Sequence, residues 1–190
     1  MIAAMAFALS APAGCGDATP DFNSNPSANC ISSLTPCGGD LTGTWGRVRA
    51  CSVYSPACIR DATVESTNLS RFSADGTFST TEGADTTDST LAGGCYRPGA
   101  HFAGQACADE HSNLSTGSSC AFEQSGECHC TGSNAYPGGG PGTWAANDRT
   151  MTITYSDGSM RTFDYCVSNG LMLSHLISAP SITINYYTRR

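Results

Sequence analysis

Cysteines are the residues of this chain whose number and spacing could do the most chemistry. The sequence contains 11 cysteines in 190 residues, and an odd number of thiols cannot pair completely. Cys15 stands apart because it follows an apolar N-terminal stretch, and without it the remaining ten can all pair. We therefore predict disulfide bonding, in an oxidising compartment outside the cytoplasm, for the other ten: Cys30, Cys37, Cys51, Cys58, Cys95, Cys107, Cys120, Cys128, Cys130 and Cys166.

The N-terminus has features of an export signal. Residues 2–9 form an apolar run that fits a signal-peptide core and is far shorter than the roughly 20 residues needed to cross a bilayer. Small residues lead up to the cysteine in the run Ser-Ala-Pro-Ala-Gly-Cys, residues 10–15, as they do in a lipobox. We predict a signal peptide over 1–14 and lipidation of Cys15 as the first residue of a mature bacterial lipoprotein.

A second cleavage site provides the alternative. Ala11-Pro12-Ala13 is also an A-x-A site for ordinary signal peptidase, and cleavage there would leave a soluble secreted protein. The parity of the cysteines favours the lipid anchor. We expect an exported protein of the cell envelope, an outer-membrane lipoprotein held at the membrane by its N-terminal lipid.

Composition argues against some partners and favours a disulfide-stabilised fold. The net charge is −7 and all nine basic residues are arginine, so the chain lacks the basic cluster that binds nucleic acid or anionic membranes. Large aliphatic side chains are few, so hydrophobic burial alone would stabilise a fold weakly. Disulfides contribute about 2–4 kcal/mol each and can compensate for a thin core.

Two parts of the mature chain differ in composition and periodicity. Residues 15–38 are rich in Ser, Asn, Pro and Gly without periodicity, which is typical of a disordered, flexible tether. From Leu41 onward the sequence changes to short Thr- and aromatic-containing runs separated by turn dipeptides, without convincing helical periodicity. We therefore predict a lipidated tether over 15–38 and a folded domain over 39–190.

Turn dipeptides predict a series of β-hairpins. Asp-Gly, Asn-Gly and Ser-Gly supply the positive φ that tight hairpin turns require. Successive hairpins at this spacing predict an all-β fold, an antiparallel meander that closes into a small barrel or sandwich. The turns and the strands that they separate are Asp75-Gly76 between 68–72 and 77–81, Ser125-Gly126 between 120–123 and 127–131, Asp157-Gly158 between 150–155 and 160–167, and Asn169-Gly170 between 160–167 and 171–177.

Hydrophobic alternation supports these strands, because residues two apart share one face of a strand. His175 alternates with Leu171 and Leu173, and we expect it to point inward as a core or rim histidine rather than a catalytic base. The sets expected to share a face are Met151, Ile153 and Tyr155; Leu171, Leu173 and Ile177; and Ile182, Ile184 and Tyr186.

The two ends of the predicted barrel resemble a known superfamily. The run Asp-Leu-Thr-Gly-Thr-Trp, residues 40–45, is similar to the G-x-W signature that opens the first strand of lipocalin-like (calycin) barrels, and the last strand ends in arginine as theirs commonly does. The runs Phe-Ser-Ala-Asp-Gly-Thr-Phe, residues 72–78, and Tyr-Cys-Val-Ser-Asn-Gly-Leu, residues 165–171, are also similar to strand-turn-strand pieces of Cys-rich, lipocalin-like bacterial lipoproteins, and the resemblance covers residues 38–190. It implies a lipocalin-like barrel in which Trp45 packs across the floor against Arg189 or Arg190, a structural cation–π contact.

Neither possible metal cluster has the ligand spacing of a known zinc site. Cys128-His129-Cys130 would place both sulfurs on one face of a strand and the imidazole on the other. We therefore expect no metal and no cofactor. A looser group could gather around Zn²⁺ but lacks paired C-x₂-C or H-x₃-H spacing: His101, Cys107, Asp109, Glu110 and His111.

Spacing suggests some disulfide pairings, although ten cysteines leave the connectivity open. The hairpin around residues 125–126 would bring Cys120 within disulfide reach of Cys128 or Cys130. Three further pairs could close local loops: Cys30/Cys37, Cys51/Cys58 and Cys95/Cys107.

The sequence favours binding over catalysis. It contains no G-x-S-x-G elbow and no H-E-x-x-H motif, so we do not expect an enzyme, and a hydrolase ranks third. The lipocalin resemblance implies binding of a small apolar or amphipathic ligand in the barrel. The alternative is a surface structural or interaction protein with a filled barrel. An apolar cavity of at least ~300 Å³ would favour the binder, whereas the alternative predicts a core packed solid by Trp45, Trp144, Phe163 and Tyr165.

Overall fold

The computed structural model describes residues 33–55, 58–91, 107, 118–124, 127–179 and 182–190. Several predictions from the sequence lie outside this part of the chain. They concern the signal segment 1–14, the lipidated cysteine, most of the tether and the looser acidic and histidine group, with the residues Cys15, Cys30, Cys95, His101, Asp109, Glu110 and His111.

Strands make up the described fold, as the hairpin pattern predicts. Apart from a single helical position at Cys107, the regular structure of the described residues is β. The strands are β1 (Gly43–Ser55), β2 (Cys58–Ser66), β3 (Leu69–Phe72), β4 (Thr77–Thr80), β5 (Gly83–Leu91), β6 (Ser119–Phe122), β7 (Cys128–Tyr136), β8 (Gly139–Ala146), β9 (Thr150–Thr154), β10 (Met160–Ser168), β11 (Leu171–Leu176) and β12 (Ile182–Arg189).

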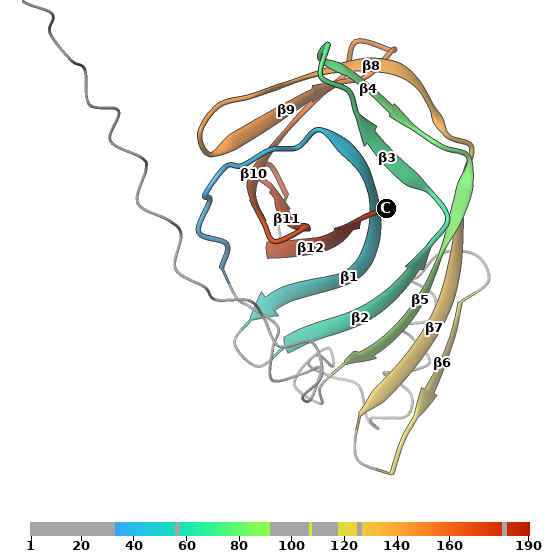
Figure 1. The fold of residues 1–190 in the computed structure, drawn as a ribbon. Helices are drawn as coiled ribbons and strands as arrows, with labels where there is room; N and C mark the ends of the chain where they lie inside the picture. Colours follow the sequence, from blue (N-terminus) through green and yellow to red (C-terminus); the bar gives the residue numbers. More distant parts are fainter. Residues whose placement is uncertain (1–32, 56–57, 92–106, 108–117, 125–126, 180–181) are drawn as a thin grey trace, which may run out of the picture.

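Eight of these strands close into an antiparallel barrel (Figure 1). Their order around the barrel is β12, β11, β10, β9, β8, β4, β3 and β1, and β1 then pairs with β12. Closure leaves no exposed sheet edge in this part of the molecule. The architecture is compatible with a lipocalin-like fold.

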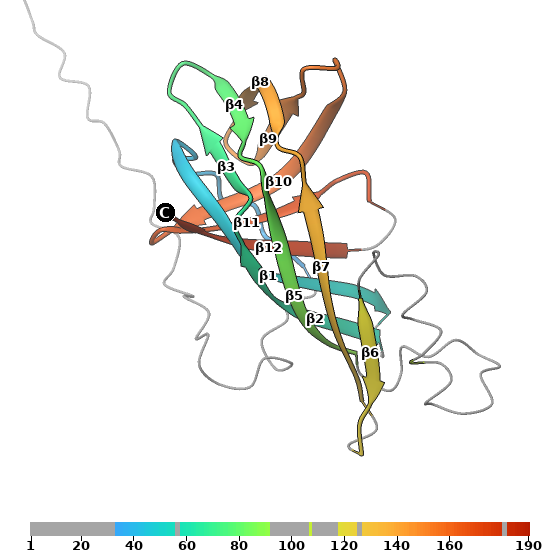
Figure 2. The same ribbon diagram turned by 90° about the vertical axis from the view of Figure 1, so that its right-hand side faces the viewer.

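The barrel is closed on one half and flares on the other. β1 pairs with β3 through residues 43–46 and with β2 from residue 49 onward, so two short strands follow one another along β1. β4 and β5 follow one another in the same way, as do β7 and β8. Figure 2 shows β2, β5, β7 and β6 extending beyond the closed half as a curved sheet.

The predicted hairpins form where the turn residues require them. β3 pairs with β4, β6 with β7, β9 with β10 and β10 with β11. Asn169 and Gly170 both adopt positive φ, 51° and 76°, which a two-residue hairpin of the right twist needs. In the turn before β4, Asp75 accepts hydrogen bonds from the backbone N–H and the hydroxyl of Thr77, which fixes the turn locally.

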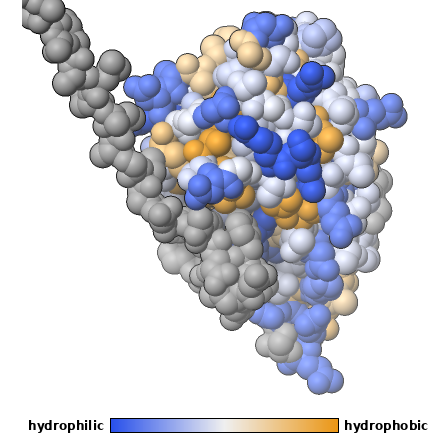
Figure 3. All heavy atoms as spheres, in the orientation of Figure 1, coloured by the Kyte–Doolittle hydropathy of each residue, from blue (hydrophilic) through white to orange (hydrophobic). Residues whose placement is uncertain are grey.

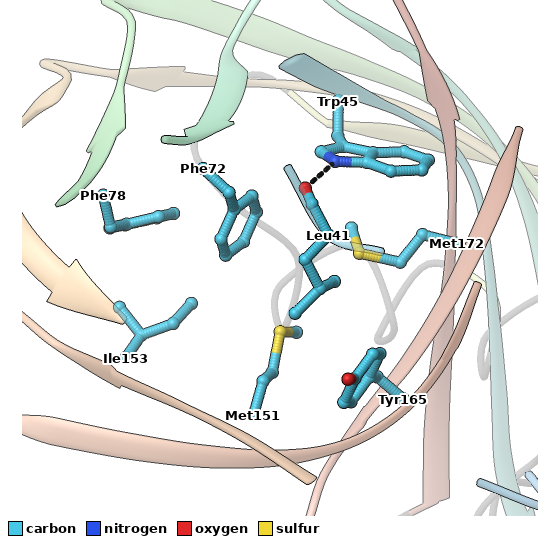
Figure 4. Close-up of a cluster of buried hydrophobic side chains, with 8 residues drawn as sticks. All are labelled: Leu41, Trp45, Phe72, Phe78, Met151, Ile153, Tyr165 and Met172. Atoms are coloured by element: carbon cyan, nitrogen blue, oxygen red, sulfur yellow. Dashed lines mark hydrogen bonds between the residues drawn. The ribbon is translucent and has the colours of Figure 1, made fainter. Parts of the chain in front are cut away.

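An apolar core fills the closed half of the barrel (Figure 4). Trp45 is completely buried, and its indole N–H donates to the carbonyl of Leu41 at 2.7 Å. Trp144 and Phe163 are only partly buried at the edge of this cluster. The fully enclosed members are Leu41, Trp45, Phe72, Phe78, Met151, Ile153, Tyr165 and Met172.

On β11 and β12 the hydrophobic alternation is present, but the face predicted for the barrel interior is wrong. Met172 and Ser174 of β11 point inward, whereas Leu171 and Leu173 pack on the opposite face in a cluster that includes Leu34 and Ile184. His175 shares that outer face, and its Nδ1 lies 3.2 Å from the carbonyl of Thr183. The apolar side of the last strands therefore covers the outside of the barrel. The side that faces inward is more polar, because it carries Ser174, Thr183 and Asn185 beside Met172.

The chain before β1 is fixed to the barrel. Cys37 forms a disulfide with Cys166 of β10, and Gly38 makes a parallel bridge to the same residue. Gly38 has a φ of 73°, and a Cβ there would lie 2.4 Å from the carbonyl oxygen of Asp148, so only glycine fits. The end of the predicted tether, residues 33–38, thus lies against the barrel wall before the chain enters the core at Leu41.

Candidate binding cavity

A cavity of about 310 Å³ lies on the inner face of the flared half, next to the apolar core. Most of its lining residues are polar, and the apolar ones are Ala50, Ala62 and Val64. Such a volume lies at the lower end of small-molecule sites. The polar lining residues are Arg47, Ser52, Arg60, Thr87, Ser118, Thr131, Asn134, Tyr136, Thr183 and Asn185.

A β-bulge in β1 turns the side chain of Arg47 toward the cavity. Residues two apart on a regular strand share a face, but the register with β12 shifts between Arg47 and Arg49. Arg47 therefore points into the barrel, whereas Val48 and Arg49 lie on the outer side with Ile184. Bulges commonly redirect a side chain in this way.

An ion pair separates the apolar core from the cavity. Arg47 pairs through Nη2 with Oδ2 of Asp85 on β5, and its Nη1 donates to Oδ1 of Asn185 on β12 at 3.3 Å. Burial lowers the pKa of Arg47, but Tyr187, Asp85 and Tyr136 together raise it by more than burial lowers it. The pKa of Arg47 therefore lies above its ordinary value, and Arg47 stays charged. The floor thus links three strands through charge-assisted hydrogen bonds.

Asp85 carries a polar atom without a partner. The residue is only 4% exposed, and its Oδ1 accepts no hydrogen bond from the described residues. Asp85 lies directly opposite Asn134 of β7, and cross-strand partners share a face, so both side chains point to the cavity side of the sheet. A buried acceptor left unsatisfied costs about 1–3 kcal/mol and calls for an explanation.

Hydroxyl groups and a second arginine line the wall beyond the floor. Arg60 donates through Nε and Nη2 to Oγ of Ser89, and that buried hydroxyl donates in turn to the carbonyl of Cys130. The hydroxyls of Ser52 and Thr183 lie 3.0 Å apart across β1 and β12. The wall therefore offers both donors and acceptors to a polar guest.

The predicted barrel-floor residues lie at the closed end, away from the cavity lining. The guanidinium of Arg189 sits 4.9 Å from the centroid of the Trp45 ring and also donates to the carbonyl of Asp40. Arg190 instead lies along Gly46, where an added Cβ would meet its Nε at 2.8 Å. Of the two arginines, Arg189 therefore stacks on the tryptophan. The contact is a cation–π pair on the buried tryptophan.

Three disulfides join described residues. Cys120 and Cys130 are direct partners on β6 and β7 and form a disulfide, the second of the two pairings that their hairpin allowed. Cys128 instead binds Cys107, so a Cys95/Cys107 pair is wrong. Cys37 binds Cys166, which likewise excludes Cys30/Cys37. In both cases the observed disulfide joins cysteines that are farther apart in the sequence than the predicted pair, because folding brings these sulfurs together from separate segments.

Cys51 is also disulfide-bonded. Its predicted pairing with Cys58 lies outside the described side chains and stays a prediction.

The Cys-His-Cys run behaves as strand geometry predicts. Cys128 and Cys130 are buried on one face with their sulfurs 3.7 Å apart, and His129 points to the other face toward Asp88. Together with Cys120 these sulfurs lie within 4.8 Å of one another. Each of them is held in a disulfide, so none is a thiolate that could bind a metal.

The visible outer surface is largely polar. In Figure 3 hydrophilic and neutral residues cover most of the described face, and the orange areas lie between hydrophilic residues. Within the described ranges, no helix has the length and apolarity needed to cross a bilayer.

No family model, curated protein or solved structure matches this chain.

Sequence reasoning missed the cavity residues, although a signal for them exists. β5, with the sequence Gly-Ala-Asp-Thr-Thr-Asp-Ser-Thr-Leu, has no apolar face, and a strand that crosses a hydrophobic interior would have one. Its inner residues include Asp85, Thr87 and Ser89. A strand that is polar on both faces inside a closed meander could therefore have indicated a polar interior.

Proposed function

We propose that this protein is an exported binding protein of the cell envelope whose lipocalin-like barrel holds a small polar solute. The cavity of about 310 Å³, lined mainly by polar side chains above the Arg47–Asp85 floor, carries the proposal. Disulfides fit an oxidising location outside the cytoplasm. Binding requires no chemical step by the protein.

A polar ligand is favoured over the apolar one that the family resemblance implies. An apolar guest would strip water from Arg47, Asn134 and the wall hydroxyls without replacing their hydrogen bonds. Burying such groups unpaired costs about 1–3 kcal/mol each. A polar guest with some apolar surface can satisfy them and still cover Ala62 and Val64.

A structural or interaction protein with a filled barrel remains the second candidate. The closed half supports it, because apolar side chains such as Trp45 and Phe72 fill that half. The flared half supports binding, because it holds the open volume. The two candidates differ in whether a solute occupies the flared half.

A calorimetric and thermal-shift screen tests occupancy. The panel contains neutral sugars, polyols, amino acids, small carboxylates and one fatty acid. We expect saturable binding of at least one polar compound, with the fatty acid inactive. Ala62→Phe, which directs a large side chain into the cavity, should abolish that binding.

Thr63→Phe is the matched control, because Thr63 neighbours Ala62 on β2 but is exposed on the other face. It should bind like the unmodified protein, and circular dichroism confirms that both variants fold. Failure of the whole polar panel, or undiminished binding by the Ala62→Phe variant, would favour the filled-barrel role.

We further propose that Cys15 carries a diacylglyceryl group that anchors the protein, consistent with the small residues that precede it. Intact mass spectrometry of membrane-extracted protein should show the lipid mass on an N-terminal peptide beginning at Cys15. A mature protein that begins at Gly14 would exclude the anchor and support the soluble secreted form.

A further inference from the structure

We infer that the solute is a neutral, hydroxyl-rich molecule of monosaccharide size, held by Asp85, Asn134 and Arg47. This inference rests on the proposed function and names the ligand class of the same cavity. It starts from the buried carboxylate oxygen of Asp85, which has no hydrogen-bond donor among the described residues.

The Oδ1 atom of Asp85 needs a hydrogen-bond donor. Oδ2 of Asp85 is satisfied by Arg47, whereas Oδ1 accepts nothing from the described chain. Asp85 is not itself a lining residue, but its ion-pair partner Arg47 and its cross-strand partner Asn134 both line the cavity, so a ligand hydroxyl that reaches between them would be the donor that Oδ1 lacks. Satisfying a charged acceptor is worth more than a neutral hydrogen bond.

A second polar group converges on the same place. Asn134 lies directly across from Asp85 and lines the cavity, and its amide makes no hydrogen bond with the described part of the chain. Side chains opposite each other on neighbouring strands have Cβ atoms about 5 Å apart. An acceptor and an amide at this separation can bind adjacent hydroxyl groups, as found on a sugar ring.

Charge decides between neutral and ionic solutes. Arg47 and Asp85 neutralise each other at the floor, so a ligand anion there would face Asp85 and a ligand cation would face Arg47. Arg60 also lines the cavity, and its guanidinium donates to the hydroxyl of Ser89 and makes another interaction. Hydroxyl groups, which both donate and accept, match the ion pair without adding charge.

Size and surface fit the same class. A cavity of about 310 Å³ lies at the lower end of the range for small-molecule sites, which suits a solute of monosaccharide size. Ala62, Val64 and Tyr136 provide apolar surface for the C–H faces of a sugar ring. Such a mixture of apolar contact and a few placed polar groups is typical of ligand sites.

Titration calorimetry with glucose, galactose and mannose tests the inference, with glucuronate and glucosamine as charged analogues. We expect at least one neutral sugar to bind more tightly than its charged analogues. Asp85→Asn should weaken binding roughly tenfold or more, because a charged acceptor is lost. Asn134→Ala leaves the Arg47–Asp85 pair intact and should weaken it several-fold, so the inference remains testable if the Asp85 variant is unstable.

Asp88→Asn is the control on the same strand, because Asp88 is 62% exposed and pairs outward with His129. It should bind sugar normally. Wild-type affinity in the Asp85 and Asn134 variants, or tighter binding of a charged analogue, overturns the inference. If no sugar binds but another polar compound does, and the Ala62→Phe variant no longer binds that compound, the ligand class is wrong and the proposed function stands. If no polar compound binds, both fail.

Discussion

Two arginines separated by one residue serve opposite faces of β1. Arg47 points inward to Asp85, whereas Arg49 points outward and binds both carboxylate oxygens of Asp61, at 2.8 Å and 2.6 Å. The guanidinium of Arg49 also lies 5.6 Å from the ring centroid of Tyr186. The outer pair is buried and bidentate, so it fixes β1 against β2, while the inner pair forms the cavity floor.

Removing one member of the buried outer pair should be costly. We expect Asp61→Asn to lower the free energy of unfolding by about 3 kcal/mol, because it removes the carboxylate that pairs with the buried Arg49. Asp88→Asn breaks an exposed pair with His129 and should cost less than about 1 kcal/mol. Urea denaturation of both variants measures the difference, and equal losses would contradict a structural role for the outer pair.

At the scale of elements, turns and close strand contacts set the meander. The turns before β4 and β10 carry the same Asp-Gly chemistry, in which the aspartate accepts from the residue two positions later. Between β8 and β9 the backbones approach closely at Gly142, where a Cβ would lie 2.3 Å from the carbonyl oxygen of Thr154. Local turn chemistry starts the hairpins, and glycine permits their packing.

The turn aspartates should titrate at low pH. Hydrogen bonds from the hydroxyl and then the backbone N–H of Thr77 lower the pKa of Asp75, and Ser159 does the same for Asp157. A lowered folded-state pKa stabilises the fold above the unfolded value of about 3.9, and this contribution disappears as pH falls through the folded value. In a carboxyl NMR titration, Thr77→Val should raise the pKa of Asp75 and leave that of Asp157 unchanged. A shift of both, or of neither, would contradict this account.

Two glycines of β8 provide a matched test of strand packing. Gly142→Ala should destabilise the protein by about 1–3 kcal/mol, because its methyl group would force β8 and β9 apart. Gly140→Ala should change stability little, because its methyl group would make ordinary contacts with the Ser156 side chain, at 3.5 Å from Oγ and 3.8 Å from Cβ. Thermal unfolding compares the variants. A harmless Gly142→Ala would show that the two strands can separate without loss.

At the scale of the whole molecule, disulfides connect parts that strand pairing leaves separate. Cys37–Cys166 spans 129 residues and fixes the entering chain to the outer wall of β10. Cys107–Cys128 and Cys120–Cys130 stabilise the far end of the flared sheet, where β6 is an edge strand. The closed half has an apolar core, so the flared half depends more on its sulfur links.

The long-range disulfide should contribute most to stability. In the loop-closure model Cys37–Cys166 is worth about 5 kcal/mol, and Cys120–Cys130, with a separation of 10, about 3 kcal/mol. Replacing each pair by serines and measuring guanidinium unfolding should reproduce this order. An unchanged melting temperature after full reduction would show that the disulfides do not stabilise the domain.

The sequence by itself determined the all-β class, the hairpins and the alternation of the strands, because turn dipeptides and two-residue periodicity act between neighbours in the chain. Only the tertiary structure decided which face of β11 and β12 looks inward, since alternation defines two faces but closure chooses between them. The same holds for Cys37–Cys166, for the bulge that turns Arg47 inward and for the pairing of Asp85 with Asn134. Each depends on segments that meet only when the barrel closes, and the polar cavity exists because closure placed the polar faces inside.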